Sequence, residues 1–400
     1  MNEILILGGG ASGMAAALRA AEHGTVTLLE RQPRLGRKLL ATGNGRCNLT
    51  NVGAAPENYH GASADFVKPA LTAYPPTAVL DFFRSLGLRT VEEYGGRVYP
   101  ASDHAGSVLD VLRLELERRG VRVLCGAGAE ALRRDGRGFA VLCGGETYRA
   151  GRVIVACGGC AGGKLGGVTD GYRLLQALGH QRTALHPALV PLRCDSADPK
   201  ALKGVRVTAK ATVFRGDAPL QSETGDVLFT DTGLSGTAIF SLSRCAAVGG
   251  AGLSVPLDLF PEDAEDAIYE DLKQRRARFM ARPANELLVG ALHGRVGLIL
   301  CRAAGLSGGA TAETLTDAQL RRLARLAKDY RFPISGVGGF DAAQVTAGGM
   351  DTREFDPNTL QSRLVPDLYA CGEVLDVDGD CGGYNLQWAW ASGLLAGELR

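Results

Sequence analysis

The chain has 400 residues, of which 46% are hydrophobic and 22% are charged, an ordinary globular composition with room for two or three packed units. Its 44 lysines and arginines balance 43 acidic residues, so no net field attracts nucleic acid or anionic lipid. The first apolar run is too short for a signal-peptide core, and no stretch has the roughly 18 apolar residues of a membrane helix. We expect a cytoplasmic protein without nucleic-acid or membrane partners, whose oligomeric state the sequence leaves open.

The chain begins with the order strand, glycine turn and helix. An apolar run at 3–7 leads into the glycine-rich residues 8–13, and the alanine-rich segment that follows predicts a helix to about residue 22. Gly8 permits a sharp turn, Gly10 leaves space for a pyrophosphate, and Gly13 lets the helix lie close to the sheet. Unpaired amides at the helix start attract the phosphates. The pattern therefore predicts dinucleotide binding.

An acidic residue ends the second predicted strand, 25–30. This residue, Glu30, comes 17 residues after Gly13, where a carboxylate accepts hydrogen bonds from both hydroxyls of an adenosine ribose. Because an acid at this position disfavours a 2′-phosphate, FAD or NAD fits better than NADP.

The segment 31–51 is basic and rich in glycine, and it ends in small polar residues. Glycines at positions 43 and 45 allow a close approach of the backbone, while Arg37, Lys38 and Arg46 offer charge to a pyrophosphate or to a reduced flavin. The alternative interpretation is a solvated loop with an asparagine-rich turn. We favour the cofactor-binding interpretation because of the motif that precedes the segment.

In the rest of the chain the pattern of predicted helices and strands changes twice. Helical spacing at 79–86 and 107–119 and strand patterns at 121–125, 139–143 and 152–156 continue the first type of fold. Between about 191 and 349 the pattern is first strand-like and then helical: strands at 205–214 and 226–229, helices at 262–280, 286–302 and 317–330. The fold then returns to the first type with a buried strand at 367–371 and a helix at 386–399.

The C-terminal strand predicts the far side of a flavin site. Glu373, just after this strand, can bond the ribityl hydroxyls of a flavin. The amides of Asn385, Leu386 and Gln387 begin a helix and can face the N1 and O2 edge, where a reduced flavin carries negative charge. This arrangement would favour the acceptance of electrons by the cofactor.

The ten cysteines show neither the spacing of a zinc site nor that of a disulfide scaffold, and we expect no metal. The pair Cys157 and Cys160 could relay electrons as a dithiol beside a flavin. We favour the simpler interpretation that Cys157 is a small strand-end residue and Cys160 a loop residue. The same loop imitates a P-loop up to Lys164, but Leu165 stands where the magnesium-binding hydroxyl is required, which rejects nucleotide hydrolysis.

Four motifs together carry a resemblance to a known family. They are residues 8–13 (GGGASG), 43–51 (GNGRCNLTN), 229–236 (FTDTGLSG) and 372–387 (GEVLDVDGDCGGYNLQ). The chain resembles the BaiN-type NAD(P)/FAD-dependent oxidoreductases, a bacterial family that includes proteins named aminoacetone oxidase and bile-acid Δ4,6-reductase. The resemblance covers residues 1–400. It implies an α/β flavoprotein in which a Rossmann-like FAD-binding domain is interrupted by an insert with a β-barrel-like part and a helical part.

The expected domain borders follow from this organisation. Residues 1–190 form the first part of the FAD-binding domain, 191–349 the insert, and 350–400 the C-terminal part. The chain departs from the family pattern at Asp231, where histidine is usual, and at Thr237, where proline is usual. Residues 157–171 also differ from the usual motif. If the family histidine donates a proton, that role is missing or moved in this chain.

The expected cofactor site combines both ends of the chain. Its predicted members are Gly8, Gly10, Ala11, Ser12, Gly13, Glu30, Arg31, Lys38, Gly43, Asn44, Gly45, Arg46, Cys47, Asn48, Cys157, Gly158, Gly372, Glu373, Asp376, Gly382, Gly383, Asn385, Leu386 and Gln387. For the proton we single out Tyr384, next to the glycines that face the flavin, and His186, at the crossing into the insert. The alternatives are packing under the flavin for Tyr384 and a hydrogen-bonded hinge role for His186.

Three functions compete. The first is an FAD-dependent reductase that takes hydride from NADH or NADPH and reduces an activated carbon–carbon double bond of a small apolar substrate, such as a steroid-like enone; no second glycine motif for NAD(P)H follows a strand. The second is an oxidase of a small amine or amino-ketone. The third is a non-enzymatic, flavin-bound redox-sensing protein that uses Cys157 and Cys160. Modification of RNA is disfavoured, because the charge is balanced and no basic and aromatic stripe occurs.

Overall fold

The computed structural model describes residues 3–63, 65–306 and 309–400. It divides into two compact units: the first combines the chain up to Pro187 with the chain from Phe340 onward, and the second is Ala188–Gly339. The sequence predicts the borders at 190/191 and 349/350. The segment 340–349 belongs to the first unit, where the Thr346 amide donates to the Glu373 carboxylate at 2.8 Å.

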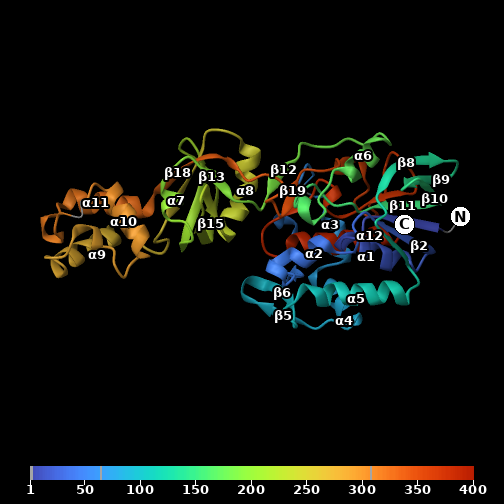
Figure 1. Ribbon diagram of the computed structural model, residues 1–400, viewed down its shortest axis with the longest axis horizontal. Coiled ribbons are helices and arrows are strands. Elements are labelled where there is room, and N and C mark those ends of the chain that lie inside the picture. Colours follow the sequence, from blue (N-terminus) through green and yellow to red (C-terminus); the bar gives the residue numbers. More distant parts are fainter. Residues whose placement is uncertain (1–2, 64, 307–308) are drawn as a thin grey trace. The chain divides into compact units, whose positions relative to one another are not determined.

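The first unit contains a five-stranded parallel sheet, of which β2 and β11 are labelled in Figure 1. Its order is β20-β11-β1-β2-β7, so strands from the start, the middle and the end of the chain lie side by side. The bounds are β1 Glu3–Leu7, β2 Thr25–Glu30, β7 Arg122–Cys125, β11 Arg152–Val155 and β20 Leu368–Ala370. β1 pairs with neighbours on both edges and is buried from Ile4 to Leu7, which accounts for its continuous apolar sequence.

The helices of the first unit include one from each end of the chain. They are α1 Ala11–Ala20, α2 Arg37–Ala41, α3 Lys68–Ala73, α4 Pro76–Ser85, α5 Ala105–Arg118, α6 Asp170–Gln176 and α12 Tyr384–Gly397. α1 and α12 pack against each other at backbone distance (Figure 1). A Cβ atom at Gly393 would lie 2.4 Å from the Ser12 carbonyl oxygen, and one at Gly397 would lie 2.6 Å from that of Ala16. Glycine at these two positions therefore allows the two ends to meet.

Four small sheets complete the first unit. Their orders are β3-β6-β5, β10-β9-β8, β21-β4 and β12-β19. The bounds are β3 Thr50–Asn51, β4 Tyr59–His60, β5 Thr90–Glu93, β6 Arg97–Pro100, β8 Ala129–Asp135, β9 Gly138–Cys143, β10 Glu146–Ala150, β12 His186–Ala188, β19 Val345–Ala347 and β21 Asp378–Gly379. The β21-β4 pair joins the C-terminal segment to the N-terminal segment a few residues before α12 begins.

The second unit contains a closed six-stranded barrel in the order β13-β16-β15-β14-β17-β18, together with a group of helices. The strands are β13 Leu192–Cys194, β14 Arg206–Arg215, β15 Ala218–Phe229, β16 Gly233–Ser235, β17 Leu253–Asp258 and β18 Tyr330–Val337. The helices are α7 Asp198–Ala201, α8 Thr237–Gly249, α9 Glu265–Arg278, α10 Gly294–Ala303 and α11 Asp317–Lys328. α9, α10 and α11 share one buried core with the barrel.

The structure confirms the predicted fold class, a Rossmann-type α/β domain interrupted by a barrel and a helical part. One predicted helix differs. The pattern at 286–302 predicted a single helix, whereas α10 begins only at Gly294. Gly290 adopts a left-handed backbone conformation with φ +82°, and a bridge between Val289 and Leu292 closes a turn there. The apolar spacing before this turn therefore belongs to a loop and a short 3-10 turn, not to the helix.

A buried histidine fixes the segment that precedes β20. The side chain of His180 is fully buried; its Nδ1 lies 3.0 Å from Glu354 Oε2 and its Nε2 lies 2.9 Å from Ser362 Oγ. The imidazole also stacks on Phe355 at 4.6 Å. Burial lowers the pKa of His180, and the Glu354 carboxylate opposes this effect only in part.

This histidine makes stability depend on pH. Because the pKa of His180 is lower in the folded protein, the unfolded chain binds the extra proton first, and we expect the free energy of unfolding to fall as the pH drops below about 6.5. His180→Gln should be less stable at neutral pH and should lose this part of the decline. Urea unfolding of both proteins at several pH values measures the difference, and parallel pH profiles would contradict the assignment.

Candidate cofactor site

The glycine turn after β1 is tightly packed at Gly8 and Gly13 but open at Gly10. Gly8 has φ +111°, and a Cβ there would lie 2.4 Å from the Ala156 carbonyl oxygen. A Cβ at Gly13 would lie 1.9 Å from the Gly8 carbonyl oxygen, whereas one at Gly10 would meet nothing within 4 Å. Gly10 is also the N-cap of α1 and supplies no side chain to the helix amides. The open backbone at Gly10 and the first amides of α1, at Ala11 and Ser12, fit a pyrophosphate.

Glu30 ends β2 beside the glycine turn, as the sequence predicts. Its Oε2 accepts from the Gly9 amide and its Oε1 from the Gln32 amide, each at 2.6 Å. Each carboxylate oxygen retains a second lone pair, so these bonds orient the acid and leave acceptor capacity for ribose hydroxyls. Its neighbour Arg31 forms an ion pair with Asp170 at 3.1 Å on the surface.

An ion pair joins the two chain segments of the first unit. Lys38 Nζ of α2 lies 2.8 Å from Glu373 Oε2, and both side chains are partly buried. Glu373 Oε1 also accepts from the Thr346 amide, and Thr346 Oγ1 accepts from the Ala161 amide at 3.0 Å. Four separate segments therefore meet at Glu373. The sequence contains no motif around Thr346 that would have revealed its part in this network.

The loop 42–48 contains residues in the left-handed backbone conformation, and its arginine, Arg46, is paired with acidic side chains. Asn44 and Cys47 have φ of 57° and 62°, and a Cβ at Gly45 would meet nothing within 4 Å. Cys47 is buried, which raises the pKa of its thiol to about 12. Arg46 stacks on Tyr99 at 4.1 Å and forms ion pairs with Glu93 and Asp103. The structure thus gives Arg46 two acidic partners in addition to any role toward a cofactor.

The second glycine pair forms the N-cap of α12. Gly383 has φ +104°, and a Cβ there would lie 2.9 Å from Asn48 Oδ1. That oxygen is buried and has no hydrogen-bond partner within the described residues, so it fits a ligand that brings a donor. The amides of Asn385 and Leu386 lie in the first turn of α12, where backbone donors lack partners in the helix.

The side chains at the start of α12 have structural roles. Gln387 is fully buried; its side-chain Oε1 accepts from Thr50 Oγ1 at 2.6 Å, and its Nε2 donates to the Tyr74 carbonyl at 2.8 Å. The backbone amide of Gln387 donates to the Gly383 carbonyl. The side chain of Asn385 bonds the backbone of Gly379. The backbone amide of Gln387 therefore already has an acceptor inside the helix. Of the three amides predicted to face the flavin, those of Asn385 and Leu386 remain as candidates.

The remaining predicted residues connect the two segments. Asp376 accepts from the Ala62 amide at 3.1 Å, and a Cβ at Gly372 would lie 2.4 Å from Ser12 Oγ. A Cβ at Gly158 would meet nothing within 4 Å. The Cys157 thiol donates to the Leu7 carbonyl at 3.3 Å, and burial raises its pKa to about 12. A buried thiol that stays protonated suits a packing role better than a dithiol relay.

The two candidate proton donors lie in different surroundings. Tyr384 begins α12, and its ring meets that of Tyr59 edge to face at 6.4 Å. The Tyr59 hydroxyl donates to the Tyr384 carbonyl at 3.0 Å. His186 is half-buried at the start of β12, the partner strand of β19. Sequence reasoning overlooked a third candidate, His60, which lies 2.8 Å from Asp380.

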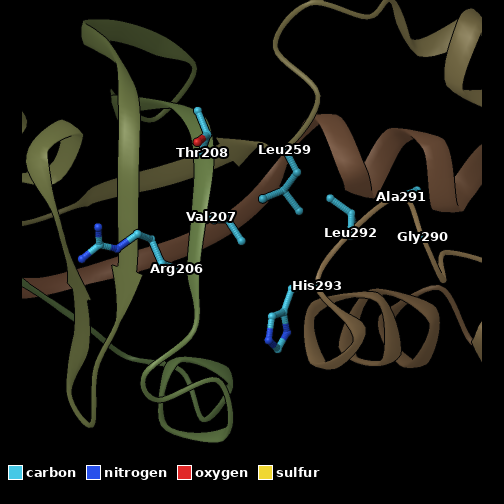
Figure 2. Close-up of a pocket in the computed structure, with 8 residues that line it drawn as sticks. All are labelled: Arg206, Val207, Thr208, Leu259, Gly290, Ala291, Leu292 and His293. Atoms are coloured by element: carbon cyan, nitrogen blue, oxygen red, sulfur yellow. The ribbon is translucent and has the colours of Figure 1, made fainter. Parts of the chain in front are cut away.

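The insert contains a hollow of about 360 Å³ that no sequence motif indicated (Figure 2). It is lined by Arg206, Val207 and Thr208 of β14, by Leu259, and by residues 290–293. Val207, Leu259 and Leu292 point toward the gap together with the ring of His293, while Arg206 extends away from it. His293 Nδ1 accepts from the Arg295 amide at the start of α10, so this ring serves as a helix cap.

The residues that the structure describes hold neither a membrane-spanning helix nor a candidate metal cluster. None of their helices is both long and apolar enough to cross a membrane. Nor do three or more histidine, cysteine or acidic side chains among them cluster in a way that could hold a metal ion.

The chain is an FAD-dependent oxidoreductase, and its Rossmann-type unit is built from both ends of the chain. The model of the HI0933-like protein Rossmann domain matches residues 2–399, and the chain belongs to this family. It is 40% identical over 404 aligned residues to the 3-dehydro-bile acid delta(4,6)-reductase of Clostridium scindens, covering 100% of this chain and 98% of the relative. These matches confirm the resemblance that the motifs carried.

More distant relatives have other names. The ribosomal RNA dihydrouridine synthase of Escherichia coli is 30% identical over 98% of this chain and 96% of its own. Among solved structures, the 3-ketosteroid delta1-dehydrogenase of Sterolibacterium denitrificans matches 100% of this chain and 99% of its own with a TM-score of 0.51. Its identity is 13%, so this likeness shows a shared fold alone.

Proposed function

We propose that this chain transfers hydride from NADH or NADPH, through FAD, to an activated carbon–carbon double bond of a small, apolar, steroid-like enone. The observation that carries the proposal is the end-to-end identity of 40% with a reductase named for 3-dehydro bile acids. A 3-oxo-Δ4,6 system is a conjugated dienone, in which the ketone makes the distant carbons electrophilic. Such a substrate accepts hydride at carbon and then needs one proton.

The residues of the chain would bind and orient the cofactor. FAD, when bound, supplies hydride transfer. The amides of α1 would hold the pyrophosphate, Glu30 the adenosine ribose, and the Lys38–Glu373 pair the ribityl region. The first amides of α12 would place partial positive charge against the edge that becomes negative on reduction.

A second candidate is reduction of uridine in ribosomal RNA, favoured by the 30% identity to dihydrouridine synthases over nearly the whole chain. The chemistry is related, because the C5=C6 bond of uracil is conjugated to the C4 carbonyl and also accepts hydride followed by a proton. The balanced charge of the chain favours the small apolar substrate.

Anaerobic turnover separates the candidates. The holoprotein is mixed with NADH or NADPH and with a 3-oxo-4,6-diene bile acid, and products are analysed by mass. We expect a gain of two hydrogens per turnover, and no reaction with the saturated 3-oxo acid. A parallel mixture contains a uridine-bearing ribosomal RNA fragment in place of the bile acid, and another contains aminoacetone without NADH or NADPH, also under anaerobic conditions. Reduction of the RNA alone would favour the second candidate, and flavin bleaching by the amine alone would favour an oxidase; either result would overturn the proposal.

A further inference from the structure

The turn at residues 380–383, between β21 and α12, carries a histidine–aspartate pair. Asp380 Oδ1 lies 2.8 Å from His60 Nε2, and Asn58 Nδ2 donates to Asp380 Oδ2 at 3.3 Å. The Asp380 amide donates to the Asn58 carbonyl, and β4 pairs with β21, with His60 opposite Asp378. Backbone and side-chain bonds together therefore fix this carboxylate against the imidazole.

The pair leaves one ring nitrogen available for chemistry. Because the carboxylate accepts from Nε2–H, it sets the orientation of the ring and leaves Nδ1 to gain or release a proton. The side chain of His60 is 33% exposed, so a ligand can reach it. Gly383, the N-cap of α12 at the predicted flavin edge, is only three residues from Asp380.

An arginine lies next to the same turn. Arg97 begins β6, and a Cβ at Gly382 would lie 3.6 Å from its Nε. Asn51, the partner of Arg97 in the β3-β6 pair, donates to the Gly382 carbonyl at 3.0 Å and fixes this approach. Arg97 is half-buried, yet across the described parts of the chain no carboxylate or carbonyl accepts a hydrogen bond from its guanidinium.

Arg97 differs in this respect from the neighbouring Arg46, which has two carboxylate partners. A half-buried cation normally pairs with an anion in the protein, since burial without a partner is costly. The guanidinium of Arg97, next to the turn at residues 380–383, can therefore donate hydrogen bonds to an oxygen that carries or develops negative charge.

We propose that Arg97 and His60 activate the acceptor in the reaction described above, on which this inference rests. Arg97 donates to the ketone oxygen of the enone. Hydride adds to the electrophilic carbon, the π electrons move to the oxygen as an enolate that Arg97 stabilises, and the Nδ1–H of the protonated His60 gives its proton to the α carbon. One hydride and one proton are consumed, and NADH or NADPH supplies the hydride. Asp380 is a positioning residue.

Single-turnover kinetics test the role of His60. In His60→Asn, reduction of the flavin by NADPH or NADH should stay within about twofold of wild type, while anaerobic reoxidation by the dienone should slow about 100-fold. In His60→Ala, added imidazole should restore part of the lost rate. The matched control is His23→Asn, because His23 is an exposed histidine that follows α1; this variant should behave as wild type.

Substitutions of Arg97 test its role through the rate of flavin reoxidation. Arg97→Gln should slow reoxidation by about 100-fold, and Arg97→Lys should retain a larger part of the rate because it keeps the charge. Asp380→Asn should slow reoxidation to a smaller extent than His60→Asn. Arg137→Gln, an exposed arginine in the β8–β9 turn, is the control.

The outcomes separate this inference from the proposed function. If the wild-type protein does not reoxidise with the dienone, the proposed function fails. If the wild type reoxidises and His60→Asn and Arg97→Gln do so equally fast, or if both half-reactions slow together without imidazole rescue, the inference is overturned. Flavin content and thermal unfolding report independently whether each variant is folded.

Discussion

Gly393→Val is expected to separate the two ends of the chain. The new side chain would begin 2.4 Å from the Ser12 carbonyl oxygen in α1, and α1 in turn packs on β1, β2 and β11 of the parallel sheet. We expect a loss of about 3 kcal/mol or more in the free energy of unfolding, together with loss of bound FAD. Thermal unfolding and the flavin content of the purified protein measure both effects.

Alanine at the same position gives a sharper comparison. A glycine-to-alanine change inside a helix normally stabilises it by about 1 kcal/mol. At Gly393 we expect the opposite sign because of the contact with α1. Gly294→Ala, in the first turn of α10, where a Cβ would meet nothing within 4 Å, should be neutral or stabilising. Equal effects of Gly393→Ala and Gly294→Ala would contradict the packing of α1 on α12.

Gly10→Ala should weaken FAD binding and leave the protein folded. A Cβ at Gly10 meets no protein atom within 4 Å, and φ is −81°, which any residue adopts. The stability of the FAD-free protein should therefore change by no more than about 1 kcal/mol, the usual effect of a changed N-cap. The methyl group would instead occupy the space assigned to the pyrophosphate, and we expect affinity for FAD to fall about 100-fold, or about 2.7 kcal/mol.

Gly9→Ala is the matched control for this change. A Cβ at Gly9 would lie 2.3 Å from Leu35 Cδ2 and 3.1 Å from the Glu30 side chain, so it should lower the stability of the FAD-free protein. Titration of stripped protein with FAD, followed by flavin fluorescence, and thermal unfolding without FAD separate the two effects. If Gly10→Ala binds FAD as tightly as wild type, the pyrophosphate does not lie at this turn.

The local elements were predictable because their signals are local. The apolar run of β1, the turn at Gly8 and the alanine-rich α1 each follow from neighbouring residues, and the sequence placed all three. The change to alternating residues at 205–214 likewise indicated β14 of the insert barrel. The helix pattern before Gly294 misled because apolar spacing persists through a turn whose left-handed glycine is visible only in the backbone.

The pairings between distant residues were not predictable. The sequence predicts that Glu373 bonds a flavin, and in the structure it also binds Lys38, 335 residues away, and the Thr346 amide. The sequence predicts that Arg46 offers charge to a pyrophosphate or a reduced flavin, and the fold also brings Glu93 and Asp103 to it. His60 and Asp380, separated by 320 residues, have no shared motif. Such contacts depend on which strands become neighbours, which the sequence of one chain does not state.

The most direct test is a single anaerobic turnover of the FAD-loaded, photoreduced protein with a 3-oxo-4,6-diene bile acid. We predict that the spectrum of oxidised FAD returns while one equivalent of the dienone is consumed, and that the saturated 3-oxo acid leaves the flavin reduced. A flavin that stays reduced in the presence of the dienone, or a protein that purifies without FAD and does not take it up, would contradict the assigned reaction.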